Sequence, residues 1–119
     1  MRIFDYIDDD PLVQITISNP RNKIEKRTLA YADTGSTVLA IPKDIWDYLG
    51  LEYTESTMVG TVHGLDWAWI DWVDVEFIDN FELVPVILSK DPEVILGRFI
   101  LDKFVVTFDG RTKKLKVED

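Results

Sequence analysis

The sequence has 119 residues, 46% of them hydrophobic, with no cysteine, one histidine and a net charge of −9. This length and composition fit one globular domain, residues 1–119, and the negative charge excludes nonspecific binding to nucleic acid or to an anionic membrane surface. Because there is no cysteine and only one histidine, disulfides, thiol catalysis and a histidine metal cluster are excluded, and we expect no metal or other cofactor.

The first third of the chain has the alternating pattern of β-strands. Residues 1–10 contain no apolar signal segment, so we expect a cytoplasmic protein. Apolar and polar residues alternate over 13–17, which predicts a half-buried strand. A turn at 19–22 leads into a second strand over 23–32, and residues 38–41 form a short apolar strand.

A short helix is predicted next. Pro42 suits the first helical turn, where its missing N–H costs nothing. Ile45, Trp46 and Leu49 then share one helical face, and Gly50 is placed to end the helix after about two turns.

The middle of the chain predicts a long hairpin, with arms over 53–59 and 67–77 around the glycine-containing segment 60–64. On the second arm, Asp71 interrupts an otherwise apolar face. Three tryptophans on this arm are expected to pack it against the body of the protein or to form pocket walls: Trp67, Trp69 and Trp72.

The last third of the chain also has strand patterns. A tight turn at 79–80 leads to a strand over 82–88, and residues 104–108 and 113–117 form a closing hairpin. The sequence therefore predicts an all-β domain with one or two short helices.

Two motifs in this predicted fold carry chemical information. Residues 32–38 read ADTGSTV directly after a strand, and alone this stretch could be a simple turn, because Asp and Gly are turn residues. Residues 94–98 read VILGR, with the loop DPE at 91–93 before them and the glycine-containing stretch MVGTVHG at 58–64 between the two motifs. In this order the segments resemble those of the retroviral-type (retropepsin-like) aspartic proteases, and the resemblance covers about residues 11–117.

The resemblance implies a closed acid-protease-type barrel with a flap hairpin, one lobe per chain. It also implies an aspartic endopeptidase that hydrolyses extended peptides as a homodimer, because the chain has only one Asp-Thr-Gly triad and each subunit would supply one Asp33. The stretch FDGR at 108–111 lacks the threonine and fits a hairpin turn. Two carboxylates about 3 Å apart, at an effective dielectric of about 20, repel by roughly 5 kcal/mol, so the pair would hold one proton.

The resemblance also implies roles for the triad and its neighbour. Asp33, Thr34 and Gly35 are the expected catalytic residues: Asp33 carries the chemistry, Thr34 hydrogen-bonds across the dimer axis, and Gly35 points its N–H at the carboxylate. The hydroxyl of Ser36 is expected to reach the outer carboxylate oxygen.

The second motif is expected to support the triad and to contact substrate. Gly97 lets the chain pass close behind the triad, and Ile95 is either a pocket wall or a core residue. Arg98 commonly pairs in the family with an acid shortly after the triad, but residues 36–38 contain none. Glu93 either faces solvent or biases the enzyme toward a basic or polar residue beside the cleaved bond.

The glycine-containing segment is expected to close over the substrate, which would bind by strand addition. Val62 is the expected apolar tip and Gly64 gives flexibility. His63, beside the tip, is an expected substrate contact; it is either an ordinary exposed turn histidine or a pH switch or metal ligand.

The two ends of the chain carry opposite charges, with acids over 5–10 and basic residues over 111–116. The resemblance implies termini that interleave across the dimer, which opposite charges would favour, although lysines also protect edge strands from aggregation.

Two other functions stay open. One is a catalytically silent module of the same fold that dimerises or binds peptides. The other is a glycosidase with paired carboxylates, although no pair of acids lies in a comparable motif.

Overall fold

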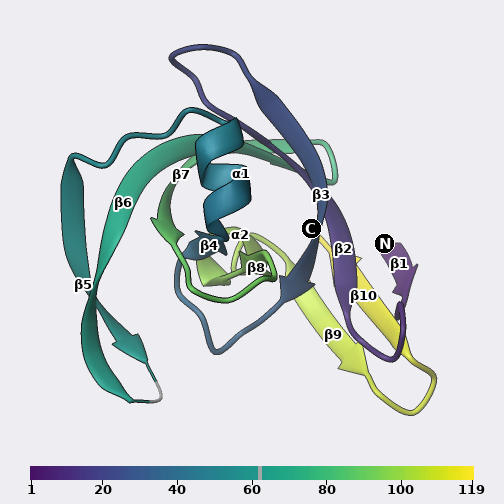
Figure 1. The fold of residues 1–119 in the computed structure, drawn as a ribbon. Helices are drawn as coiled ribbons and strands as arrows, with labels where there is room; N and C mark the ends of the chain where they lie inside the picture. The colour runs from purple at the N-terminus through teal and green to yellow at the C-terminus, as the bar shows by residue number, and fades with distance from the viewer. Residues whose placement is uncertain (62) are drawn as a thin grey trace.

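The computed structural model describes residues 1–61 and 63–119, which form ten strands and two short helices (Figure 1). In chain order these are β1 (Arg2–Asp5), β2 (Leu12–Ser18), β3 (Glu25–Ala32), β4 (Leu39–Ile41), α1 (Lys43–Tyr48), β5 (Glu55–Thr61), β6 (Gly64–Phe77), β7 (Asn80–Leu88), β8 (Ile95–Leu96), α2 (Arg98–Leu101), β9 (Val105–Asp109) and β10 (Lys114–Glu118). The predicted all-β class is confirmed. Neither helix in the described part of the chain is long and apolar enough to cross a membrane.

The main sheet closes on itself. Its strands follow the order β2-β3-β8-β4-β7-β6-β5, and β2 also pairs with β6 through residues 16–18 and 74–76. Six strands therefore form a closed barrel, as expected, and β5 extends from β6 as the outer arm of a hairpin. Because β8 lies between β3 and β4, the segments that follow β3 and β8 are held side by side.

The core lies inside this barrel. Along β2 the apolar residues Val13, Ile15 and Ile17 are buried and alternate with more exposed polar residues, as the period of a strand requires. The apolar face of α1 covers the barrel with Trp46, and Gly50 ends the helical segment with a left-handed φ of +69°.

Strand boundaries differ from the prediction at three turns. The turn predicted at 79–80 lies at Ile78 and Asp79, which both have a left-handed φ, so β7 begins at Asn80. β3 begins at Glu25 instead of residue 23, because Lys23 takes a left-handed φ of +66° that prolongs the turn. The arms of the β5–β6 hairpin reach Thr61 and Gly64, which are in register, so its turn is shorter than predicted. Val62, the expected tip, lies outside the described residues.

The expectation that the tryptophans pack the hairpin against the body is wrong for two of them. Trp67 is 64% exposed on the part of the hairpin that projects away from the barrel (Figure 1). Trp72 is 48% exposed where β6 pairs with β7, because its neighbour Val73 takes the buried face of the strand. Trp69 makes an edge-to-face contact with Tyr53, with ring centroids 5.9 Å apart. The ring of Tyr53 in turn lies 5.9 Å from that of Trp46 in α1. Trp69 is therefore connected to α1 through Tyr53.

A second, three-stranded sheet has the order β1-β10-β9. β1 was not predicted, and it pairs antiparallel with β10 of its own chain, with Ile3 opposite Lys116. Asp5 contacts Lys114 across this pairing. The opposite charges of the two ends therefore meet within one chain, and β1 is already paired without a partner subunit.

Candidate active site

Asp33 lies where β3 ends and the triad loop, residues 33–37, begins. The strand end is held from both sides, because the Ala32 N–H donates to the Pro11 carbonyl (3.0 Å) and the Asp33 N–H donates to the Leu96 carbonyl (3.0 Å). The Asp33 side chain is half-buried. Backbone hydrogen bonds from β8 and from the segment before β2 thus fix the position of this carboxylate.

The backbone of the triad loop contacts the side-chain carboxylate of Asp33. The Gly35 N–H donates to Oδ1 of Asp33 at 2.8 Å, and the Ser36 N–H donates to the Asp33 carbonyl at 3.3 Å. A Cβ on Gly35 would lie 3.1 Å from the same Oδ1, which is a tight contact. Glycine at position 35 therefore lets the backbone approach the carboxylate closely. Thr34 is exposed beside it.

Gly97 lies directly behind the triad loop. A Cβ at this position would lie 2.6 Å from the Val38 carbonyl oxygen and 2.7 Å from that of Ser36. Because both contacts are with backbone atoms, no side-chain rotation could relieve them. Glycine is therefore required for the close approach between the two motifs.

The residues after Gly97 fasten the loop further. The Arg98 N–H donates to the Ser36 carbonyl (2.9 Å), and the Phe99 N–H donates to the Thr37 carbonyl (3.0 Å). The Arg98 guanidinium, which lacks the family's acidic partner, donates instead to the Thr37 hydroxyl at 3.0 Å. Ser36 departs from expectation, because its hydroxyl donates to the Val38 carbonyl (2.9 Å) and not to Asp33.

Two further residues near Asp33 were not identified from the sequence. The Tyr31 hydroxyl donates to Oδ1 of Asp10 at 3.1 Å. This hydrogen bond, followed by partial burial and the negative charges of Asp10, Asp33 and Glu93, raises the pKa of Tyr31 above its usual value. Tyr31 and Asp33 are two positions apart, which is the spacing that puts two side chains on one face of a strand. This spacing is the signal from which the sequence could have placed Tyr31 near Asp33.

The expected substrate-contacting residues lie on different elements. Ile95 is half-buried on β8, in register with Tyr31, and Glu93 is exposed in the loop before it. His63 is exposed, and its N–H donates to the Thr61 hydroxyl at 3.1 Å. Gly64 has a φ of +105°, a conformation that favours glycine.

A hollow flanks the β5–β6 hairpin. It lies between β6, the start of α1 and the loop that joins β7 to β8. Its lining includes Trp67 and Trp69 from β6 together with Leu88 and Pro92. Two of the three tryptophans therefore line this hollow.

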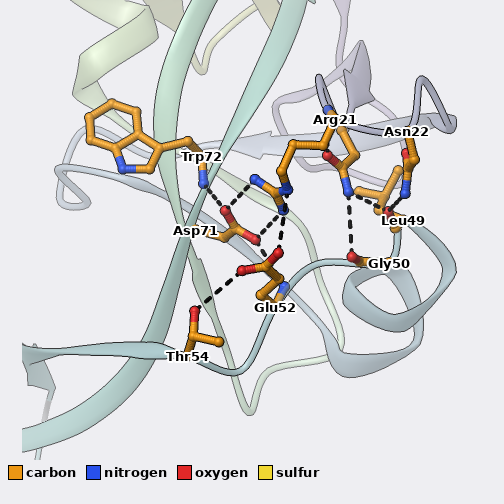
Figure 2. Close-up of polar contacts among 9 residues, drawn as sticks. Arg21, Asn22, Leu49, Gly50, Glu52, Thr54, Asp71 and Trp72 are labelled. Atoms are coloured by element: carbon orange, nitrogen blue, oxygen red, sulfur yellow. Dashed lines mark hydrogen bonds and ion pairs between the residues drawn. The ribbon is translucent and has the colours of Figure 1, made fainter.

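An ion cluster anchors the root of the hairpin, and we call Arg21, Glu52 and Asp71 the hairpin-root cluster (Figure 2). Arg21, in the turn between β2 and β3, donates from both terminal nitrogens to Asp71 on β6, at 3.0 and 2.7 Å. Its Nε lies 3.7 Å from Oε1 of Glu52, just before β5. The cluster thus connects both arms of the hairpin to the barrel.

Asp71 explains the polar interruption on the apolar face of β6. Burial of its side chain, 10% exposed, opposes ionisation, but hydrogen bonds from Arg21 and from the N–H groups of Glu52 and Trp72 outweigh burial. The pKa of Asp71 is therefore lowered.

Each chain supplies one triad carboxylate, whereas acid–base hydrolysis by aspartates needs two. In residues 1–61 and 63–119, no group of three His, Asp or Glu side chains is arranged to hold a metal ion.

Comparison with solved structures identifies the fold. A retropepsin-like aspartic protease from Rickettsia conorii matches with a TM-score of 0.70 at 18% identity, over 98% of this chain and 88% of that one. EIAV protease complexed with the inhibitor HBY-793 matches with a TM-score of 0.62 at 18% identity, over 82% and 89%. At the level of sequence, no family model and no curated protein matches. The chain therefore has the retropepsin-like fold, as its motifs indicated.

Proposed function

We propose that the protein is an aspartic endopeptidase that acts as a homodimer, with one Asp33 from each subunit. The observation that carries the proposal is the bond from the Gly35 N–H to Oδ1 of Asp33 at 2.8 Å, in a loop held against Gly97 and Arg98. A backbone donor aimed at the carboxylate fixes its orientation. This is the preorganisation that a carboxylate needs in order to act on a water molecule.

In the proposed reaction, one Asp33 carboxylate accepts a proton from water while the other, protonated, donates its proton to the peptide carbonyl oxygen. The water oxygen bonds to the carbonyl carbon, which gives a tetrahedral intermediate. The intermediate then collapses: the Asp33 that accepted the proton of water donates it to the leaving nitrogen, the C–N bond breaks, and a hydroxyl proton of the intermediate returns to the other Asp33. Two identical carboxylates can divide these roles because their repulsion keeps one of them protonated.

The surroundings of Asp33 suggest a preference among substrates. Three acids, Asp10, Asp33 and Glu93, lie close enough to Tyr31 for their negative charges to raise the pKa of the Tyr31 hydroxyl. We propose that this acidic rim, and Glu93 in particular, favours a basic or polar residue beside the cleaved bond. A positive side chain gains attraction there that an apolar one does not.

Cleavage of an extended peptide under acidic conditions tests the proposed activity. We expect turnover that a statine-type inhibitor blocks and that Asp33→Asn abolishes, because the amide can neither activate water nor exchange the proton. Asp102→Asn is the matched control, since Asp102 is an exposed aspartate outside the triad loop, and it should retain activity. Peptide binding without turnover would indicate the catalytically silent module and overturn the proposal.

A further inference from the structure

The outer surface of β6 and β7 carries a group of exposed apolar side chains. Phe81 is 70% exposed and Leu83 is 55% exposed, and Trp72 is also exposed. Phe81, Leu83 and Pro85 follow one another at alternate positions of β7, and Trp72 on β6 lies opposite Pro85. The four side chains therefore share one face of the sheet, which we call the outer β6–β7 face. Contiguous apolar surface that stays exposed is typical of an interaction site.

Two carboxylates lie within this face. On β6, Asp74 is in register with Leu83 and Glu76 with Phe81, and both acids are half-buried. In residues 1–61 and 63–119, neither acid forms an ion pair. The basic residue in the same row as Glu76 is Arg27 on β3, which is two strands away and therefore about 10 Å distant. The outer β6–β7 face is thus apolar along β7 and negatively charged along β6.

The backbone of β6 has no free edge beside these acids. Residues 74–76 pair with β7 on one side and with residues 16–18 of β2 on the other. A partner therefore cannot add a strand here and has to contact the side chains that stand above the sheet, as a helix packed on a sheet does. Side chains on one face of a strand repeat every 6.7 Å or so, close to the rise of about 6 Å between helix positions i and i+4. A helix that runs along β7 can match its apolar side chains to those of the strand.

We propose that the outer β6–β7 face binds an amphipathic helix of another protein, with apolar side chains that cover Phe81 and Leu83 and with lysines or arginines that pair with Asp74 and Glu76. Burial of apolar surface supplies the affinity, and the charges select the partner and its orientation. The acids disfavour a second copy of the chain, because the same face of that copy would bring its own Asp74 and Glu76 against them. This binding does not involve Asp33, so it adds to the proposed function and does not depend on it.

A pair of synthetic peptides tests the proposal. One is a labelled amphipathic helix of leucine and lysine, and the other has glutamate in place of every lysine. Binding is measured by fluorescence anisotropy with a statine-type inhibitor in excess, so that the proposed active site is filled and the peptide is not cleaved. We expect the lysine peptide to bind, and the glutamate peptide to bind about tenfold more weakly or not at all. Binding of neither peptide, or equal binding of both, overturns the inference.

Leu83→Ser tests the apolar part of the interaction. We expect this change to weaken binding of the lysine peptide about tenfold, because Leu83 lies at the centre of the apolar row on β7. Leu29→Ser is the matched control, since Leu29 is also an exposed leucine within a strand, 45% exposed, but lies on β3 outside this face. Binding should be unchanged in the control, and an equal loss in both variants would overturn the inference.

The double variant Asp74→Asn with Glu76→Gln tests the charges of the face. We expect about tenfold weaker binding of the lysine peptide and a smaller dependence on salt. The control, Asp102→Asn with Glu118→Gln, removes the same charge from exposed acids elsewhere and should bind as wild type does. Equal weakening would show that the peptide responds only to net charge and would contradict the proposal. Self-association in sedimentation that Leu83→Ser abolishes would show that a second copy covers this face, and would also overturn it.

Discussion

Replacing Gly97 with alanine tests whether the second motif positions the triad. The added methyl group would lie 2.6 Å from the Val38 carbonyl oxygen, whereas ordinary contact begins at 3.4 Å. The loop must therefore move by about 0.8 Å, and displacements of this size in a catalytic group lower rates by up to about a hundredfold. We expect kcat/KM to fall roughly ten- to hundredfold.

The same crowding should lower stability. Overpacking a rigid site costs about 1–3 kcal/mol, which for a domain of this size corresponds to a fall in Tm of roughly 4–12 °C. Tm must be compared at one protein concentration, because the proposed association of two chains would make it concentration-dependent. Thermal unfolding and peptide cleavage are measured on the same preparations.

Gly110→Ala is the matched control for Gly97→Ala. No heavy atom lies within 4 Å of a Cβ at Gly110, and its backbone is not left-handed. This change should be neutral or stabilise the protein by up to about 1 kcal/mol, with activity retained. If Gly97→Ala behaves like Gly110→Ala in both assays, the argument that Gly97 positions the triad loop is refuted.

Three other changes address the surroundings of the site. Arg21→Ala leaves the Asp71 carboxylate without its two-point partner and should lower the unfolding free energy by about 1–2 kcal/mol. Because folding lowers the pKa of Asp71 below its ordinary value of 3.8, its carboxylate stays charged in the folded protein from pH 7 down to pH 5. The difference in Tm between Arg21→Ala and wild type should therefore be constant over that range and shrink only below pH 3.8. A difference that disappears at pH 5 would contradict this cause. Ser36→Ala removes the bond to the Val38 carbonyl, so it should cost about 1 kcal/mol of stability and leave the pH profile of kcat unchanged, whereas a shifted profile would show that the hydroxyl acts on the carboxylate. Glu93→Gln should lower the ratio of cleavage at lysine-containing to leucine-containing peptides, and an unchanged ratio removes the proposed preference.

The strands could be predicted from the sequence because alternation of apolar and polar residues is a local signal, whereas the closed barrel was implied only by the resemblance of the motifs to those of a known family. Val13, Ile15 and Ile17 reveal their strand without knowledge of any partner. The helix was likewise predicted from Pro42 and Gly50, which mark its two ends.

What the sequence could not show depends on contacts between distant residues. Asp10 and Tyr31 are 21 positions apart, and their hydrogen bond forms only when the barrel closes. β1 is a four-residue strand with a charged residue at each end, so it lacks the apolar–polar alternation that predicts a strand. It is a strand because it pairs with β10. Asp71 was visible only as an interruption, because its partner Arg21 comes from a turn 50 positions away.

The central claim, that one active site needs Asp33 from two chains, is tested most directly by mixing subunits. Wild-type and Asp33→Asn chains are unfolded together, refolded in varying proportions and assayed for peptide cleavage at constant total protein. If both carboxylates are required, activity follows the square of the wild-type fraction, so that about one quarter remains in an equal mixture. Activity that falls in direct proportion to the wild-type fraction would show that a single chain suffices and would contradict the account.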